Sequence, residues 1–308
     1  MERKISLDDI RKTVDEAYEN FKSVKEGSID SRLKDVDPEK FGISVVLTDG
    51  TVINKGDAQE KAAIGNISKL AIASVLLAQN TPDELVKKSG SAECCCHGKQ
   101  KPDIPFSAHG IRAVSAVAPQ NDPEGKYDIL LNRLIDMAGD APEFDDNLYK
   151  TLSAQAKEAD VENKIAQAQY DLYDNTAVAL EVYLKLNSLK MSAQQLATMG
   201  ATIAADGVNV INNNVVFDGS IAANIVTLAA IHGKKKAIRG WLMSVGLPAK
   251  GSFAGALVAI LPGFGAIAAY SPELNCYGRS ARGSEAIKYI ANKLQLNVFA
   301  SARVSVEK

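Results

Sequence analysis

The sequence predicts an α+β protein whose antiparallel sheet is built from both ends of the chain, is flanked by helices and receives an inserted helical domain. Strand patterns occur near residue 45 and again near residue 260, and a helical pattern fills most of the chain between them. Strands placed at both ends of a long helical run are typical of an α+β arrangement. We place the sheet domain at residues 1–69 and 200–308, and the inserted, mainly helical domain at residues 70–199.

The N-terminal part predicts a helix, a hairpin and a second helix. Residues 6–23 form the first helix, because Ser6 is a suitable N-cap and apolar side chains follow at helical spacing. Asp49-Gly50 lies between two strand-like segments, which indicates a tight hairpin turn. Residues 68–79 are almost entirely apolar, so this helix is expected to be buried on most sides.

The remaining elements follow a proline-rich region. Prolines and scattered glycines between residues 81 and 123 indicate irregular structure. The elements expected after it are helices over residues 128–187, 192–205 and 284–294, and paired strands over residues 254–260 and 266–271. Ser192 is the expected cap of the second of these helices.

Charge and hydropathy exclude several classes of partner. The chain has 308 residues with 35 Lys+Arg and 37 Asp+Glu, a net charge of −2, so no cationic excess is available for nucleic acid or an anionic membrane surface. No apolar run reaches the length of a membrane-spanning helix, and the N-terminus has no hydrophobic signal core. We therefore expect a cytoplasmic protein. Its four cysteines, three of them adjacent, form no disulfide framework.

Several ordered blocks resemble the serine-dependent glutaminases, which share the β-lactamase/DD-peptidase-like fold of the penicillin-binding proteins. The blocks are Phe41 to Gly50, Gly56-Asp57, Ile67 to Lys69, Leu196 to Thr202, Asp206 to Asn209, Val245 to Lys250, Leu261 to Gly263, Ala266 to Pro272 and Ser280 to Gly283. The resemblance implies a glutaminase-type amidohydrolase that converts L-glutamine to L-glutamate and ammonia. It also implies no cofactor and a homodimer or homotetramer. In this family, the serine of a Ser-x-x-Lys motif attacks the amide, and a lysine and a tyrosine move protons.

The catalytic positions implied by the resemblance are only partly retained. Lys69 matches the motif lysine and Tyr183 matches one active-site tyrosine, but the residue three positions before Lys69 is Asn66. A carboxamide has no hydroxyl that a base can activate. We therefore expect glutaminase activity to be weak or lost. This interpretation requires that no other hydroxyl or thiol lies beside Lys69.

The substrate-binding positions also depart from the family pattern. The second tyrosine of the family falls at Lys235, the segment after Lys250 reads Gly251-Ser252-Phe253, and the asparagine that binds substrate falls at Ala108. The Ser-Glu pair that holds the amino-acid head of the substrate falls near Thr151-Leu152. The alternative hypothesis is a non-catalytic or repurposed protein that uses the old cleft to bind glutamine, glutamate or another small acid.

Two further segments allow more than one interpretation. The basic segment around Lys235 is read as a solvated loop, and the alternative is that Lys235 projects into the pocket and binds an anion. Cys94 and Cys96 are weak metal candidates, since a closed zinc site needs four convergent ligands, and no metal is predicted. A reactive thiol in this segment is a second alternative, favoured by Lys99 and Lys101 nearby. We prefer a chemically idle loop to either.

Overall fold

The computed structural model describes residues 2–33, 35–81, 83–85, 104–168, 170, 172–231, 235–300 and 303–307. The chain forms two compact units, each described here by itself. Unit 1 contains residues 1–67, 134–143 and 190–308, and unit 2 contains residues 68–133 and 144–189. Within the described residues, no helix is both long and apolar enough to cross a membrane.

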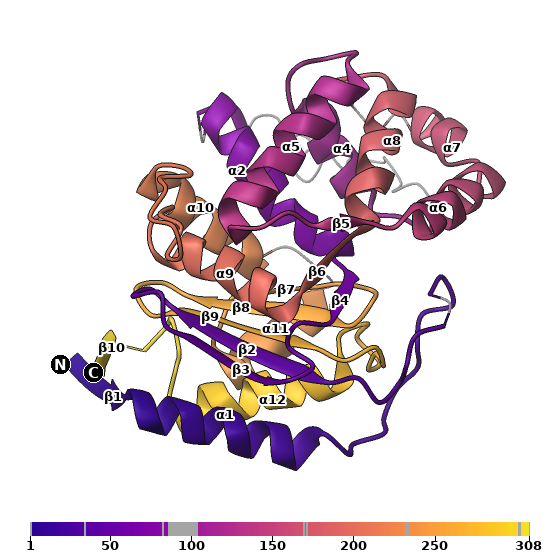
Figure 1. Cartoon of the computed structure of the whole chain (residues 1–308). Helices are drawn as coiled ribbons and strands as arrows, with labels where there is room; N and C mark the ends of the chain where they lie inside the picture. Colours follow the sequence, from indigo (N-terminus) through magenta and orange to yellow (C-terminus); the bar gives the residue numbers. More distant parts are fainter. Residues whose placement is uncertain are drawn as a thin grey trace. The chain divides into compact units, whose positions relative to one another are not determined.

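Unit 1 is built around a five-stranded antiparallel sheet of order β3-β2-β9-β8-β7 (Figure 1). Its strands are β2 (Gly42–Leu47), β3 (Val52–Gly56), β7 (Ala249–Gly251), β8 (Ala256–Leu261) and β9 (Gly265–Tyr270). The hairpin between β2 and β3 turns at Asp49-Gly50, where Gly50 has a φ of +84° and donates its N–H to the Leu47 carbonyl at 3.0 Å. Strands β2 and β9 pair directly, which joins the two ends of the chain in one sheet.

Helices cover both faces of this sheet (Figure 1). On one face lie α1 (Leu7–Phe21) and α12 (Ala281–Lys293), whose buried side chains share a core with alternate residues of the strands. On the other face lies α9 (Ala193–Ala204). A Cβ at Gly200 would lie 2.5 Å from Ala266 Cβ, so only glycine lets α9 approach β9 this closely. Since both faces are covered, the central strands are buried along their whole length.

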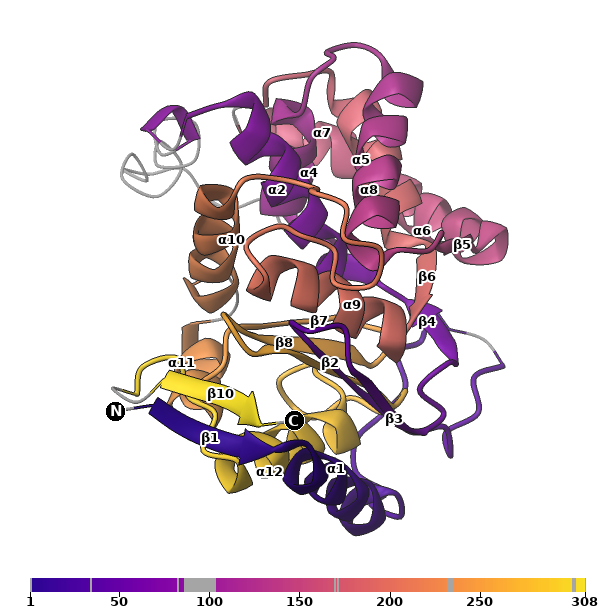
Figure 2. The ribbon, with the colours of Figure 1, turned by 60° about the vertical axis from the view of Figure 1, so that its left-hand side comes forward.

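The other elements in the described part of unit 1 are short strands, a 3-10 helix and two α-helices. They are β1 (Glu2–Ser6), β4 (Lys61–Ala63), the 3-10 helix η1 (Gly65–Ser68), α10 (Gly219–Ile231), α11 (Lys235–Val245) and β10 (Arg303–Glu307). The last residue of η1, Ser68, is the first residue of unit 2. Strands β1 and β10 pair in parallel and lie side by side near the two termini in Figure 2. Strands β5 (Glu143–Phe144) and β6 (Leu189–Ser192) carry the chain between the units, and with β4 they form a small sheet of order β4-β6-β5.

The described part of unit 2 is mainly helical. Its helices are α2 (Lys69–Gln79), α4 (Ala108–Ala116), α5 (Pro123–Ala138, which passes into unit 1 at Leu134), α6 (Asp146–Glu158), α7 (Val161–Gln167) and α8 (Thr176–Asn187). Helix α4 packs against α2 and α8. This arrangement brings the start of α2, the start of α4 and the middle of α8 together.

The sequence predicts most of these elements correctly. The N-terminal helix with its Ser6 cap, the hairpin, the apolar helix α2, the Ser192-capped helix α9 and the β8–β9 pair are all confirmed. The last helix begins at Ala281 rather than at residue 284, because the Ser280 side chain caps it by accepting the Gly283 N–H at 3.1 Å.

Three expectations differ from the structure. The region before residue 123 is not entirely irregular, because α4 forms there with Ser107 as its cap. Lys235 starts helix α11 instead of lying in a loop, since apolar residues at helical spacing, among them Trp241 and Val245, pack one side of it into the core. Residues 134–143 and 190–199 group with the sheet unit instead of the helical insert, because α9 lies on the sheet.

Candidate active site

A lysine, a serine and a tyrosine from three helices of unit 2 meet at the start of α4. Lys69 Nζ donates to Ser107 Oγ at 2.7 Å, and the backbone N–H of Ser107 donates to Tyr183 Oη at 3.4 Å. Lys69 and Ser107 are half-buried, whereas Tyr183 is buried. The ring of Phe106 packs edge-on against the Tyr183 ring, with centroids 6.4 Å apart. We define Lys69, Ser107 and Tyr183 as the Lys–Ser–Tyr cluster.

Gly110 allows the members of this cluster to pack closely. A Cβ at this position would lie 2.6 Å from Tyr183 Cε2 and 2.8 Å from Lys69 Cε. The lysine stem and the tyrosine ring therefore rest directly on the backbone of α4. Real Cβ atoms do not approach other atoms so closely, so any side chain here would displace Lys69 or Tyr183.

Replacing this glycine is expected to cost stability. Gly110→Ala should lower the free energy of unfolding by about 1–3 kcal/mol, because the added methyl overpacks the contact. The matched control is Gly240→Ala in α11, where a Cβ meets nothing within 4 Å. The control should raise stability by about 0.5–1 kcal/mol, since alanine is the better helix former. Denaturant unfolding of both variants measures the difference, and equal effects would contradict the packing argument.

Helix α4 is held firmly at both ends. At its N-terminus the Ser107 side chain is the cap and accepts the Gly110 N–H at 3.2 Å. Near its C-terminus the Lys126 ammonium donates to the carbonyls of Val114 and Val117, and it pairs with Asp174 at 3.0 Å. The side chains of Lys126 and Asp174 are both completely buried. Burial lowers the pKa of Lys126, while the hydrogen bond and the charge of Asp174 oppose that shift.

A second polar group lies one turn along α4. His109 Nδ1 and Tyr170 Oη are 2.5 Å apart, and the buried Arg112 guanidinium lies over the rings of Tyr170 and Tyr173 at 5.9 and 5.5 Å. Arg112 also donates to Tyr173 Oη at 3.3 Å. These contacts join α4 to the segment between α7 and α8.

In unit 1, Asn66 lies in η1 and is half-buried. The preceding residue, Gly65, has a φ of +46°, and its Cα faces the Phe253 ring, because a Cβ there would lie 2.9 Å from that ring. The guanidinium of Arg32 stacks on the Phe253 ring, with its central carbon 4.0 Å from the ring centroid. Arg32 is in turn held by two hydrogen bonds to the Asp30 carboxylate at 2.7 and 2.6 Å. Phe253 is therefore fixed beside the chain segment that carries Asn66.

Lys250 lies on β7 with a second cation near it. Burial lowers the pKa of Lys250 to about 8, and the positive charge of Arg279 contributes to the shift. Burial also lowers the pKa of Arg279, whose guanidinium lies 4.9 Å from the centre of the Trp241 ring. The turn after Lys250 is tied to β4, because Ser252 Oγ donates to the Ala63 carbonyl and accepts the Ala254 N–H. Two neighbouring cations in a partly buried place are suited to an anionic group.

Some of the site residues predicted from the sequence lie close together in the structure, and others are described only in part or not at all. It brings Lys69 and Tyr183 together, each beside Ser107, and it places Ala108 next to Ser107 in the first turn of α4. Gly251, Phe253 and Lys250 lie together in the β7–β8 region of unit 1. Lys235 is described by its backbone only, and Cys94 and Cys96 lie outside the described residues.

The requirement that no hydroxyl lies beside Lys69 is not met. The expectation is corrected by Ser107, whose hydroxyl is 2.7 Å from the lysine amine. Sequence reasoning missed Ser107 because the region around it reads as irregular, although the Pro105-Phe106-Ser107-Ala108 segment contains a helix-capping serine. Among the described residues, no cluster of three or more His, Cys, Asp or Glu side chains could hold a metal ion.

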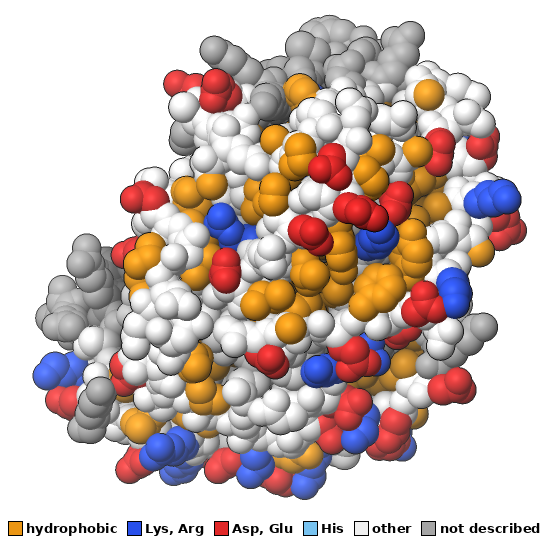
Figure 3. Space-filling view, turned by 45° about the horizontal axis from the view of Figure 1, so that its top comes forward, with side chains coloured by type: hydrophobic (Ala, Val, Ile, Leu, Met, Phe, Trp, Pro, Cys, Tyr) orange, Lys and Arg blue, Asp and Glu red, His pale blue; other side chains and the backbone are white. Residues whose placement is uncertain are grey.

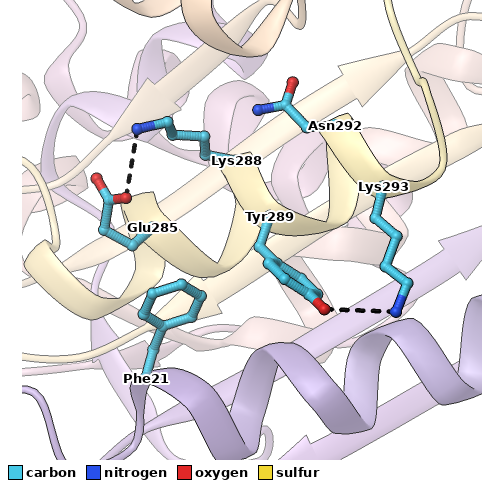
Figure 4. A pocket seen from close by; sticks show the side chains of 6 residues that line it. All are labelled: Phe21, Glu285, Lys288, Tyr289, Asn292 and Lys293. Carbon is cyan, nitrogen blue, oxygen red and sulfur yellow. Dashed lines mark hydrogen bonds and ion pairs between the residues drawn. The ribbon is translucent and has the colours of Figure 1, made fainter.

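The structure also has a groove that sequence reasoning did not indicate. It lies in unit 1 on the outer faces of α1 and α12 and has a volume of about 480 Å³ (Figure 4). Its lining residues are Phe21, Glu285, Lys288, Tyr289, Asn292 and Lys293. The charged side chains are paired, Glu285 with Lys288 and Lys293 with Glu16. None of the sequence-predicted site residues lines this groove.

The charged side chains of the surface are mixed in sign. On the face drawn in Figure 3, Lys and Arg side chains alternate with Asp and Glu side chains, and the described part of that face has no continuous basic area. This pattern agrees with the near-zero net charge.

Sequence comparison places these features in a known family. The family model described as glutaminase matches residues 28–299, and the chain belongs to that family. Among curated proteins it is similar to a glutaminase of Bacteroides thetaiotaomicron, with 32% identity over 99% of both chains. It is also similar to a glutaminase of Parabacteroides distasonis, with 30% identity over 99% of both chains.

Solved structures show the same fold. A structure described as the probable glutaminase ybaS has a TM-score of 0.87 and 26% identity, and the match covers 96% of this chain and 100% of that one. A probable glutaminase from Bacillus subtilis, complexed with 6-diazo-5-oxo-L-norleucine, has a TM-score of 0.79 at 21% identity, over 94% of this chain and 96% of that one. The chain therefore has the β-lactamase-like α+β fold of the glutaminases, with an antiparallel sheet flanked by helices.

Proposed function

We propose that this chain is a glutaminase-family protein that binds a small amino acid or acid and hydrolyses L-glutamine weakly or not at all. The observation that carries the proposal is Asn66, which we place at the position of the family's attacking serine, three residues before Lys69. A carboxamide nitrogen or oxygen does not replace an alkoxide as the nucleophile of acyl transfer.

Ser107 removes the premise that no hydroxyl lies beside Lys69, so the proposed loss of activity rests on the position of that hydroxyl. Ser107 is the N-cap of α4, whereas position 66 lies in η1, just before the start of α2 at Lys69. A substrate held for attack from position 66 is not aligned with a hydroxyl at another position, and misplacement of about 1 Å can cost about 100-fold in rate. Leu152, where the family's head-group carboxylate is expected, is buried in the core of unit 2 and offers no charge to a substrate ammonium.

Binding of L-glutamine without its hydrolysis would distinguish the proposed binding protein from an active glutaminase. We expect L-glutamine or L-glutamate at millimolar concentration to raise the melting temperature, because a ligand that binds only the folded state stabilises it. In the same samples, L-glutamine should remain intact over hours by chromatographic analysis. Rapid conversion of L-glutamine to L-glutamate would contradict the proposed loss of activity. The absence of any shift with either compound would contradict the proposed ligand class.

The pKa of Lys250 predicts how acid binding depends on pH. With a pKa of about 8, Lys250 is cationic below pH 8 and neutral above it. The affinity for glutarate, whose two carboxylates stay ionised from pH 7 to pH 9, should therefore fall as pH rises, by up to about tenfold. Titration calorimetry at both pH values measures this. Lys250→Arg is the control, since its guanidinium stays charged throughout and its affinity should stay level.

A further inference from the structure

We propose that Ser107 is a nucleophile that accepts acyl groups from small esters, with Lys69 as its general base. This inference goes beyond the proposed function, which requires only binding at this family's cleft. All of the residues involved lie in unit 2. No step depends on L-glutamine being the acyl donor.

The contact between Lys69 and Ser107 has the distance that proton transfer needs. Nζ and Oγ are 2.7 Å apart, within the range of about 2.6–3.2 Å expected of a nucleophile and its base. The amine cannot swing freely, because its stem rests on Gly110 and beside the Tyr183 ring. The base is therefore positioned before any substrate arrives.

The backbone around Ser107 favours negative charge on its oxygen. Ser107 is the N-cap of the nine-residue helix α4, and the Gly110 N–H points at Oγ at 3.2 Å. The positive end of a helix dipole and an N–H donor both stabilise an oxygen that is losing its proton. Tyr183 Oη accepts the Ser107 N–H and so fixes the backbone from which the hydroxyl projects.

Other capping serines of this chain have different partners. Ser6, the cap of α1, donates to the Asp9 carboxylate at 2.7 Å, and Ser280, the cap of α12, shares a hydrogen bond with the Ser271 hydroxyl at 2.7 Å. Both satisfy a helix end in the way that Ser107 does. Capping alone therefore does not account for a lysine amine placed against the Ser107 hydroxyl.

The reaction balances with water as the only co-substrate. Lys69, as the neutral amine, takes the Oγ proton while Oγ bonds to the acyl carbon. The tetrahedral intermediate then expels the alkoxide, which takes that proton from the Lys69 ammonium and leaves as the alcohol as its bond to the acyl carbon breaks. Water hydrolyses the Ser107 ester, releasing the acid and regenerating the hydroxyl and the neutral amine.

Labelling with a fluorophosphonate tests this proposal directly. This reagent forms a covalent bond to nucleophilic serines and releases fluoride. Peptide mass spectrometry should locate the label on Ser107 in the unmodified chain. Ser107→Asn should abolish labelling at that position, although asparagine still caps the helix. Lys69→Met should slow labelling at least about 100-fold, the lower range for loss of a general base. Ser6→Ala, which removes a capping serine without a lysine partner, should leave the rate unchanged.

The outcomes separate this inference from the proposed function. Absence of label on Ser107, or a Lys69→Met rate equal to that of the unmodified chain, would overturn the inference and leave the proposed binding function standing. Rapid ammonia release from L-glutamine that disappears in Ser107→Asn would overturn the proposed function and support the inference. If Ser107→Asn does not fold, as judged by its melting curve, Ser107→Cys replaces it. Iodoacetamide should then alkylate Cys at this position faster with Lys69 than with Lys69→Met, and equal rates would overturn the inference.

Discussion

Asn66→Ser is expected to raise the rate of ammonia release from L-glutamine at least about 100-fold. The substitution returns a hydroxyl to the position three residues before Lys69, where the family's acyl transfer begins. Loss of the nucleophile in serine hydrolases costs up to about 10⁶ in kcat, so its return should recover a large part of that. Recovery should be incomplete, because Leu152 and Phe253 still depart from the family's pocket.

Two control variants test whether the faster ammonia release of Asn66→Ser depends on the new hydroxyl and on Lys69. Asn66→Ala should behave like the unmodified chain, since neither side chain carries a hydroxyl. Asn66→Ser combined with Lys69→Met should lose the gain, because the new serine then has no base. An ammonia assay at a fixed millimolar concentration of L-glutamine compares all of them. An Asn66→Ser variant no faster than Asn66→Ala would mean that residue 66 is not at the attacking position.

Lys126→Met is expected to have the largest effect on stability, a loss of about 3–5 kcal/mol in the unfolding of unit 2. The substitution removes one partner of a completely buried ion pair and leaves the Asp174 carboxylate unpaired. It also removes the donor to the carbonyls of Val114, in the last turn of α4, and of Val117, its C-cap. Urea unfolding monitored by circular dichroism measures the loss.

The matched control for this substitution is an exposed ion pair in the same unit. Lys150 pairs with Asp146 one turn away on α6, and both side chains are largely exposed. Lys150→Met should therefore change stability very little, since exposed ion pairs are screened by water and salt. A Lys126→Met variant as stable as Lys150→Met would show that the buried pair does not hold α4 in place.

The elements that the sequence predicts correctly are those with strong local signals. Asp49-Gly50 is a turn that glycine's positive φ permits, and Ser6 and Ser192 are caps with helical patterns after them. Helix α4 was missed because it is short, follows a proline-rich stretch and is stabilised by its contacts with α2 and α8. A local sequence pattern does not predict tertiary packing of this kind.

The candidate site was predictable only in part, for a similar reason. The resemblance to the glutaminase family indicated that Lys69 and Tyr183 belong to one active site, and in the structure both lie beside Ser107. Ser107 is 38 residues from Lys69 along the chain, and no spacing rule connects them. The stacking of Arg32 on Phe253 joins residues that are even farther apart along the chain. Contacts such as these depend on how helices and turns meet, which one sequence does not show.

Steady-state ammonia release by the unmodified chain decides whether the Asn66 carboxamide has cost this chain the family reaction. We expect a kcat for L-glutamine well below about 1 s⁻¹, the lower end of ordinary enzyme rates. The rate should be the same in Asn66→Ala, because residue 66 takes no part in the chemistry. A kcat of about 1 s⁻¹ or more that falls in Asn66→Ala would contradict the claim, since it would make Asn66 itself part of a working glutaminase site.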